Sequence, residues 1–172
     1  MVGQAAKPQR AVPGSLLASA YWNSPEKVSN NIFNCTGAKV VADSLGIVHV
    51  VWSSEQHTSS ISRYKLEHRK YSNGAWSKPF VIAEGNYSSV IPAELDFDIV
   101  VDSSGRLYVF WLIHHQTQGD KICWRSLDKS GWSAIEEACP AGQFEKIQSF
   151  DAVLGKRDAL HLFVSATLPH DL

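Results

Sequence analysis

A repeated pair of apolar strands constrains this chain more than any other feature of its 172 residues. The run 40–52, VVADSLGIVHVVW, reads as a strand, a polar turn and a second strand, and the run 99–111, IVVDSSGRLYVFW, repeats it. Asp43 and Asp102, which begin the two turns, are 59 residues apart. A third, weaker copy covers 152–164. A repeat of this size predicts a fold built from similar units.

Each full unit continues into two further strands. The run 61–71 is rich in strand formers, and Asn73-Gly74 separates it from another such run at 75–83. Asn-Gly between strand-forming runs is a strong hairpin signal. No long stretch has the 3.6-residue period of a helix. Units of 50–60 residues with four short strands are typical of propeller blades. We therefore predict an all-β fold of four-stranded antiparallel blades of a β-propeller, incomplete in one chain.

The period of the repeat also sets the predicted boundaries. We expect a flexible leader followed by a partial β-propeller over 15–172. The predicted segments are 1–14 for the leader, 15–37 for the last strand of a preceding blade, 38–92 and 93–147 for two blades, and 148–172 for the inner hairpin of a further blade.

The composition excludes several classes of partner. Hydrophobic residues make up 44% of the chain and charged residues 19%, and the net charge is −1. This balance lacks the basic excess of a nucleic-acid-binding protein. No apolar run approaches the roughly 18 residues of a membrane-spanning helix, so neither nucleic acid nor a membrane is expected as a partner. The three cysteines lack the spacing of a metal site, and we expect mostly buried free thiols.

The hairpin at 41–52 and the stretch Ser126-x-Asp128-x-x-Gly131-Trp132 resemble the blade hairpin and the Asp-box of the sialidase-like (neuraminidase-like, BNR-repeat) β-propeller superfamily. The second motif departs from the usual spacing by one residue. The resemblance covers about 16–167 and implies a fold, because lectins, receptors and hydrolases share such blades. Such propellers have six or more blades, so the resemblance implies either self-association or the remainder of a longer propeller. It also favours an extracellular location, although 1–14 does not read as a signal peptide.

In such propellers two sets of loops share the functional face. Hydrogen-bonding side chains in these loops would suit sugar hydroxyls, while the alternative is an ordinary solvated loop surface. The adjacent histidines at 114 and 115 are poor joint metal ligands, because neighbouring strand residues point to opposite faces, and no metal site is expected. The candidate ligand-binding residues are Glu55, His57, Tyr87, Glu94, His114, His115 and Asp120.

Three charged residues occupy equivalent positions on the first strand of successive units, namely Lys39, Asp98 and Asp151. Paired carboxylates can divide acid and base roles in glycoside hydrolysis, which makes Asp98 and Asp151 the candidate catalytic residues. The alternative is solvation of a central channel. No arginine lies on these strands, whereas a sialidase would need three to bind the carboxylate of its substrate.

The sequence therefore favours a non-catalytic propeller module that binds a glycan or another polar ligand, with no cofactor. Two alternatives stay open. One is a fragment or subdomain of a sialidase-like glycoside hydrolase, and the other is an assembly scaffold without a small ligand.

Overall fold

The computed structural model describes residues 26–29, 34–57, 62–87, 95–114 and 118–168. The expected leader at 1–14 and the stretch 15–25 lie outside these residues. Nearly all regular structure in the described part is antiparallel β-sheet, and one short 3-10 turn is the only helical element there. The prediction of an all-β chain of antiparallel strands is thus confirmed.

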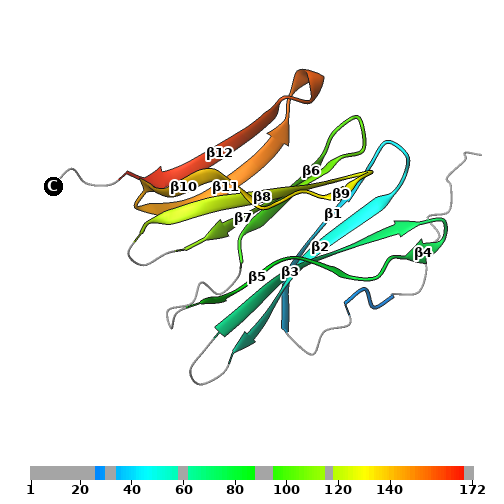
Figure 1. Cartoon of the computed structure of the whole chain (residues 1–172), viewed down its shortest axis with the longest axis horizontal. Helices are drawn as coiled ribbons and strands as arrows, with labels where there is room; N and C mark the ends of the chain where they lie inside the picture. Colours follow the sequence, from blue (N-terminus) through cyan, green and yellow to red (C-terminus); the bar gives the residue numbers. More distant parts are fainter. Residues whose placement is uncertain (1–25, 30–33, 58–61, 88–94, 115–117, 169–172) are drawn as a thin grey trace, which may run out of the picture.

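Three sheets follow one another along the chain (Figure 1). Sheet 1 consists of β1 (Asn34–Ala42), β2 (Val48–His57), β3 (Ser62–Ser72), β4 (Ala75–Trp76) and β5 (Phe80–Tyr87). Sheet 2 consists of β6 (Phe97–Val101), β7 (Leu107–Ile113), β8 (Asp120–Asp128), β9 (Gly131–Trp132) and β10 (Glu136–Phe144). Sheet 3 is the hairpin of β11 (Lys146–Leu154) and β12 (Leu160–Thr167), joined through the 3-10 turn η1 (Lys156–Asp158).

The cross-strand register repeats along with the sequence. Every Cα pairing between β6 and β7 recurs between β1 and β2 with both residues shifted by 59, and between β11 and β12 with both shifted by 53. The three hairpins therefore place corresponding side chains on corresponding faces. Equivalent cross-strand pairs are Lys39 with Val51, Asp98 with Phe110, and Asp151 with Phe163.

The turns of the first two hairpins are built alike. Oδ1 of Asp43 and Oδ1 of Asp102 each accept hydrogen bonds from the backbone N–H groups two and four residues further on, at 2.9 and 2.8 Å. Gly46 and Gly105 close these turns with φ values of 78° and 82°, a conformation that costs glycine little. The aspartates thus bond the local backbone and the glycines supply positive φ.

The fourth strand of each full unit is broken, where the sequence pattern suggested one continuous strand. β4 is separated from β5 at Ser77, and β9 from β10 at Ser133. The Ser133 hydroxyl accepts a hydrogen bond from the backbone N–H of Ser126 at 3.0 Å and donates one to the carbonyl of Ala134 at 2.8 Å. Ser77 makes the same pair of bonds in sheet 1. These side-chain bonds replace ladder bonds, so the strand bends and pairs again further along.

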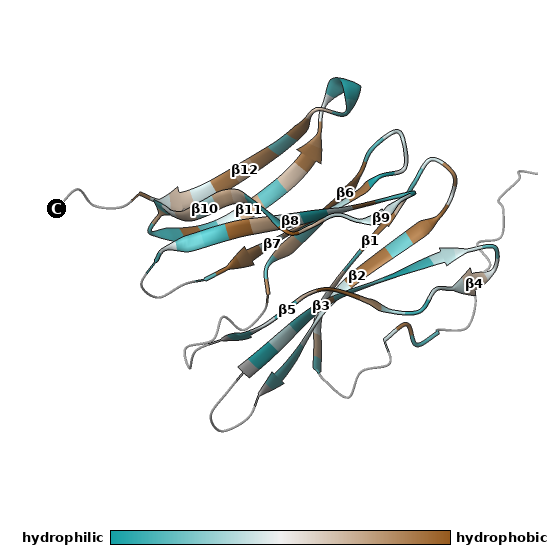
Figure 2. Cartoon of the chain, viewed as in Figure 1, coloured by the Kyte–Doolittle hydropathy of each residue, from teal (hydrophilic) through white to brown (hydrophobic). Residues whose placement is uncertain are grey.

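The sheets stack face to face in chain order, with β6 in contact with both β1 and β11. One apolar cluster, which includes Val51, Leu66 and Trp111, lies between sheets 1 and 2. A second cluster, which includes Phe110 and Phe150, lies between sheets 2 and 3. Figure 2 shows the hydrophobic residues along the strands that face these layers. The described sheets do not close into a ring or barrel, and the finer prediction of a propeller stays open.

In each full unit an arginine on the third strand bonds a segment that precedes its own sheet. Arg125 on β8 donates from Nε to the carbonyl of Ser133 at 2.7 Å and from Nη1 to the carbonyl of Ile82 in sheet 1 at 2.9 Å. Its guanidinium also lies over the rings of Phe80 and Trp132, which are stacked with centroids 5.3 Å apart. Charged donors of this kind make stronger hydrogen bonds than neutral ones.

Arg69 makes the same contacts one unit earlier. It donates to the carbonyl of Ser77 and to the carbonyl of Val28, both at 2.6 Å, and its guanidinium lies over Trp76. Val28 therefore sits against sheet 1 as Ile82 sits against sheet 2.

Two further expectations concern thiols and membranes. Cys123 and Cys139 are buried, Cys35 is exposed, and all three are free thiols. Within the described ranges, no helix is long and apolar enough to cross a membrane.

Candidate functional site

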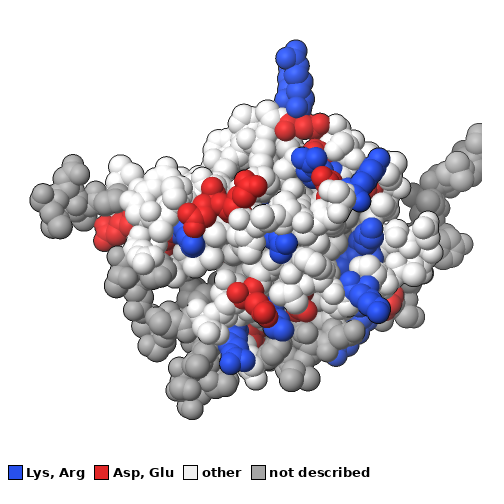
Figure 3. Space-filling model, in the orientation of Figure 1, with Lys and Arg blue, Asp and Glu red and all other residues white. Residues whose placement is uncertain are grey.

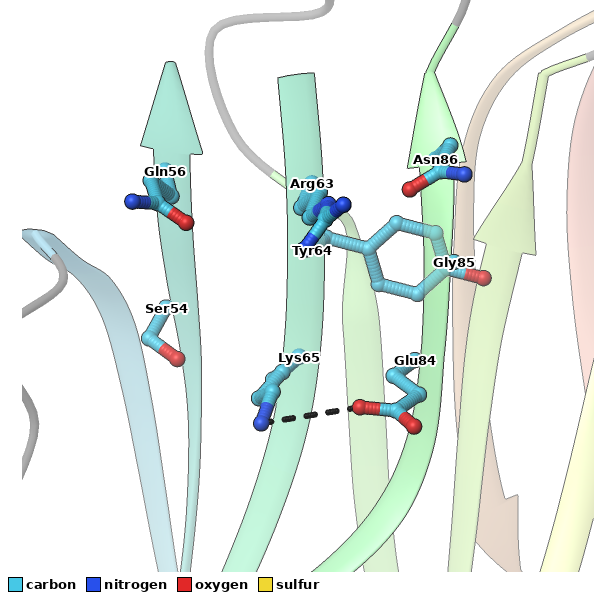
Figure 4. Close-up of a pocket in the computed structure, with 8 residues that line it drawn as sticks. All are labelled: Ser54, Gln56, Arg63, Tyr64, Lys65, Glu84, Gly85 and Asn86. Carbon is cyan, nitrogen blue, oxygen red and sulfur yellow. Dashed lines mark ion pairs between the residues drawn. The ribbon is translucent and has the colours of Figure 1, made fainter. Parts of the chain in front are cut away.

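A polar hollow of about 390 Å³ lies at one end of sheet 1, on the face turned away from sheet 2 (Figure 4). Strands β2, β3 and β5 form this hollow at the end of sheet 1 where β2 and β5 end and β3 begins. Figure 2 colours this end as hydrophilic. Its lining residues are Ser54, Gln56, Arg63, Tyr64, Lys65, Glu84, Gly85 and Asn86.

The polar side chains form two rows across the three strands. In the inner row Lys65 is paired in register with Ser54 on one side and Glu84 on the other. The Lys65 ammonium and a Glu84 carboxylate oxygen are 3.5 Å apart, and both side chains are solvent-accessible. In the outer row Arg63 stands between Gln56 and Asn86. Each row therefore combines donors and acceptors within a few ångströms.

Tyr64 lines the hollow from beneath β5. A Cβ atom added to Gly85 would lie 2.7 Å from Cε1 of Tyr64 and 2.8 Å from its hydroxyl oxygen. Only glycine at position 85 leaves room for the ring in this place. Burial is the main cause that raises the pKa of Tyr64 to about 12, so the phenol stays protonated at neutral pH.

This arrangement suits hydrogen bonding better than bond breaking. The Arg63 guanidinium offers several donors, and the Gln56 and Asn86 amides offer donors and acceptors. The carboxylate of the site, Glu84, is exposed and lies beside an ammonium group. Across the described residues, no group of three or more His, Cys, Asp or Glu side chains could hold a metal ion.

Several predicted ligand-binding residues lie at this same end of sheet 1. Glu55 is on β2 but is 1% exposed, and alternation along the strand points it toward sheet 2 rather than into the hollow. His57 ends β2 and Tyr87 ends β5. Glu94 and His115 lie outside the described residues.

The other two predicted ligand-binding residues are paired with each other in sheet 2. Nδ1 of His114 and Oδ2 of Asp120 are 2.9 Å apart. Asp120 is buried, and the same Oδ2 accepts a hydrogen bond from the backbone N–H of Ile147 at 2.7 Å. This carboxylate thus fixes the start of β11 against β8, and it lies outside the hollow of sheet 1.

The candidate catalytic carboxylates lie on the first strands of sheets 2 and 3. Oδ1 of Asp98 is 2.8 Å from the Lys39 ammonium, and Oδ2 accepts a hydrogen bond from the backbone N–H of Ala152 at 2.8 Å. Asp98 therefore links all three first strands. Asp151 is exposed on β11. Asp96 is exposed, but partial loss of hydration and the negative charges of Asp151 and Asp98 raise its pKa, while the positive charge of Lys39 opposes this rise.

Sequence reasoning missed the cationic part of the hollow. Arg63 and Lys65 alternate with Tyr64 and Leu66, which marks a strand with one polar and one apolar face. That alternation could have indicated that Arg63 and Lys65 lie together on the polar face of this strand. It could not show that Glu84 would stand beside Lys65, because the pairing depends on a register shift between β3 and β5.

Comparison with known proteins adds little to this geometry. No protein-family description and no curated protein matches the chain. One similar solved structure is a fucose lectin from Kordia zhangzhouensis in complex with methyl-fucoside, with a TM-score of 0.47 and 22% identity over 76% of this chain and 83% of that one. These values are too low to assign a common fold or a shared ligand.

Proposed function

We propose that this chain is a non-catalytic module of the β-propeller type that binds a glycan or another polar ligand. The hollow of sheet 1 is the proposed binding site. Arg63, Asn86 and Gln56 would contact the ligand at the outer end, and Lys65 with Glu84 at the inner end.

The observation that carries the proposal is the pair of polar rows across β2, β3 and β5. A hydroxyl-rich ligand needs donors and acceptors in alternation, since each hydroxyl both donates and accepts. The rows supply amides, a guanidinium and an ion pair on one rigid sheet surface. A volume of about 390 Å³ is in the range of small-molecule sites.

The stacking of the sheets supports the propeller part of the proposal. Adjacent first strands, face-to-face packing in chain order and a register that repeats from sheet to sheet are what neighbouring blades require. A sialidase-like ancestry stays part of the proposal and rests on the sequence resemblance alone.

The glycoside hydrolase alternative is weaker. A catalytic acid or base needs a carboxyl that can exchange a proton with the substrate. Both oxygens of Asp98 are instead engaged, Oδ1 by Lys39 and the backbone N–H of Ile99, and Oδ2 by the backbone N–H of Ala152 on β11. The raised pKa of Asp96 is the one observation that favours an acid on these strands.

A glycan array followed by calorimetric titration of the best sugar tests the proposed site. We expect Arg63→Ala and Asn86→Ala each to weaken binding at least about tenfold, since each removes a hydrogen bond worth ~1.4 kcal/mol or more. Lys129→Ala is the matched control, because Lys129 is an exposed cation in the turn between β8 and β9, and its replacement should leave the affinity unchanged. Equal affinity of all four proteins would exclude this site, and no binding to any glycan would favour the scaffold alternative.

A further inference from the structure

The outer face of sheet 3, the face turned away from sheet 2, exposes large apolar side chains. Phe163 is 62% exposed and Val153 is 46% exposed. β12 contains no charged residue, and the surface above β12 in Figure 3 is white up to the η1 turn. The same face also carries the exposed carboxylate of Asp151 on β11, the cross-strand partner of Phe163. Exposed aromatic and branched side chains on one sheet face mark an interaction surface.

The repeat shows what kind of surface would cover this face. By register, Phe163 corresponds to Phe110 in sheet 2 and to Val51 in sheet 1. Phe110 is 2% exposed and Val51 is fully buried, because the next sheet along the chain covers each of them. Phe163 is thus in the position that elsewhere in this protein always receives the next sheet.

The outer face of sheet 1, the face turned away from sheet 2, corresponds to the faces of sheets 2 and 3 that pack on the preceding sheet. Val40 on β1 is 66% exposed, while its equivalents Ile99 and Ala152 are each 8% exposed because they pack on the preceding sheet. On the same face Val50 and Trp52 line a hollow of about 520 Å³, together with residues 26–29 and 35–38. Trp52 is 3% exposed and residues 26–29 already lie beside it, so Val40 is the apolar position of this face that is open to another sheet.

We propose that copies of this chain associate head to tail, with the outer face of sheet 3 of one copy packed on the outer face of sheet 1 of the next. The proposal rests on the blade-like stacking of the proposed function. The two end faces are of the two types that already meet at both internal sheet interfaces, so a second copy is the complementary partner. Such a heterologous contact gives a ring if the rotation closes and a filament if it does not.

This contact would also complete the binding site. The polar hollow of Ser54, Arg63 and Asn86 lies on the same outer face of sheet 1 as Val40 and Trp52. Sheet 3 of the neighbouring copy would form its open wall. We therefore expect ligand affinity to fall when the contact is broken, although every lining residue remains unchanged.

The mass of the 172-residue chain in solution, measured by light scattering after gel filtration, tests the contact. We expect a discrete multiple of the chain mass, or growth with concentration for a filament. Val40→Asp and Phe163→Asp should each give monomers, and both replace exposed side chains, so circular dichroism should show unchanged folding. Ile135→Asp is the matched control, since Ile135 is 52% exposed in the segment between β9 and β10, and it should assemble like the parent chain.

Mixing the two monomeric variants distinguishes head-to-tail association from a symmetric contact. Each variant keeps one intact end face, so an equimolar mixture should form a capped dimer with one copy of each. A monomeric parent chain, an oligomeric single variant, or a mixture that stays monomeric would each overturn the proposal. Glycan binding by a monomeric parent chain would leave the proposed function standing, whereas an oligomer that binds no glycan would reject the function and keep the contact.

Discussion

A buried histidine pair between sheets 1 and 2 should make this protein sensitive to mild acid. His49 and His68 are 4% and 3% exposed, their rings are stacked, and Nδ1 of His49 lies 3.0 Å from Nε2 of His68. His68 also meets the edge of the Trp132 ring, with centroids 5.3 Å apart. Burial, with smaller contributions from His49 and Lys70, lowers the pKa of His68 to about 3.

The direction of the effect follows from proton binding by the two states. An unfolded histidine has a pKa of about 6.5, so between pH 6.5 and 3 the unfolded chain binds a proton at residue 68 that the native protein does not. His68 therefore costs no unfolding free energy above pH 6.5, and the unfolding free energy falls as the pH drops below that value. At pH 4.5 the unfolded chain gains about 3 kcal/mol from His68 alone, at ~1.4 kcal/mol per pH unit. Burial also lowers the pKa of His49, which acts in the same direction.

Urea unfolding at pH 7.0 and pH 4.5, followed by tryptophan fluorescence, measures this difference. We expect the parent chain to lose more unfolding free energy between the two pH values than His68→Gln does, by about 3 kcal/mol. Gln118→Ala is the control, because Gln118 is exposed and carries no titratable group, so its replacement should leave the pH dependence unchanged. If parent and His68→Gln lose the same free energy over this range, the buried pair is not the acid-sensitive element.

Three other predictions test the packing and the site. Arg125→Ala should cost about 2 kcal/mol in urea unfolding, because it removes the hydrogen bond to Ile82 in sheet 1 and the one to Ser133 beside β9, while the exposed Arg106→Ala should cost less. Gly85→Ala should cost about 2 kcal/mol, because the new methyl group overlaps the Tyr64 ring, and Tyr64→Leu in the same chain should recover part of the loss. A panel of aryl glycosides should give no turnover, and turnover that disappears with Asp98→Asn would instead favour the hydrolase alternative.

The sequence could predict the hairpins because their information is local. Alternating apolar residues, an aspartate that bonds its own turn and a glycine with positive φ all lie within about 13 residues in the first two copies. The third copy shows the limit of this reading. There the turn is the 3-10 element, and Arg157 and Asp158 take the positive φ values that a glycine supplies elsewhere.

The candidate site could be predicted only by region. The end of sheet 1 that forms the hollow is the end the sequence indicated, since His57 and Tyr87 end two of its strands. The side chains that line the hollow were not predicted, because alternation along β2 assigns Glu55 and Ser54 to opposite faces, and sequence reasoning selected the buried one. Which face is free depends on how the sheets stack, and that is a long-range property.

The residues that fix the stacking are polar, which is why an apolar pattern could not reveal them. At corresponding positions facing the next sheet, Val51 becomes Phe110 and Leu66 becomes Ile122, so the apolar contacts differ from layer to layer. Arg69 and Arg125, by contrast, are the same residue at a spacing of 56, and each reaches a carbonyl of the preceding segment. Apolar cores tolerate such changes in shape, whereas a guanidinium that bonds two carbonyls fixes both distance and orientation. Arg125 thus fixes sheet 2 against sheet 1, and the carboxylates of Asp98 and Asp120, which accept hydrogen bonds from the backbone of β11, fix sheet 3 against sheet 2. The apolar side chains fill the space between the sheets.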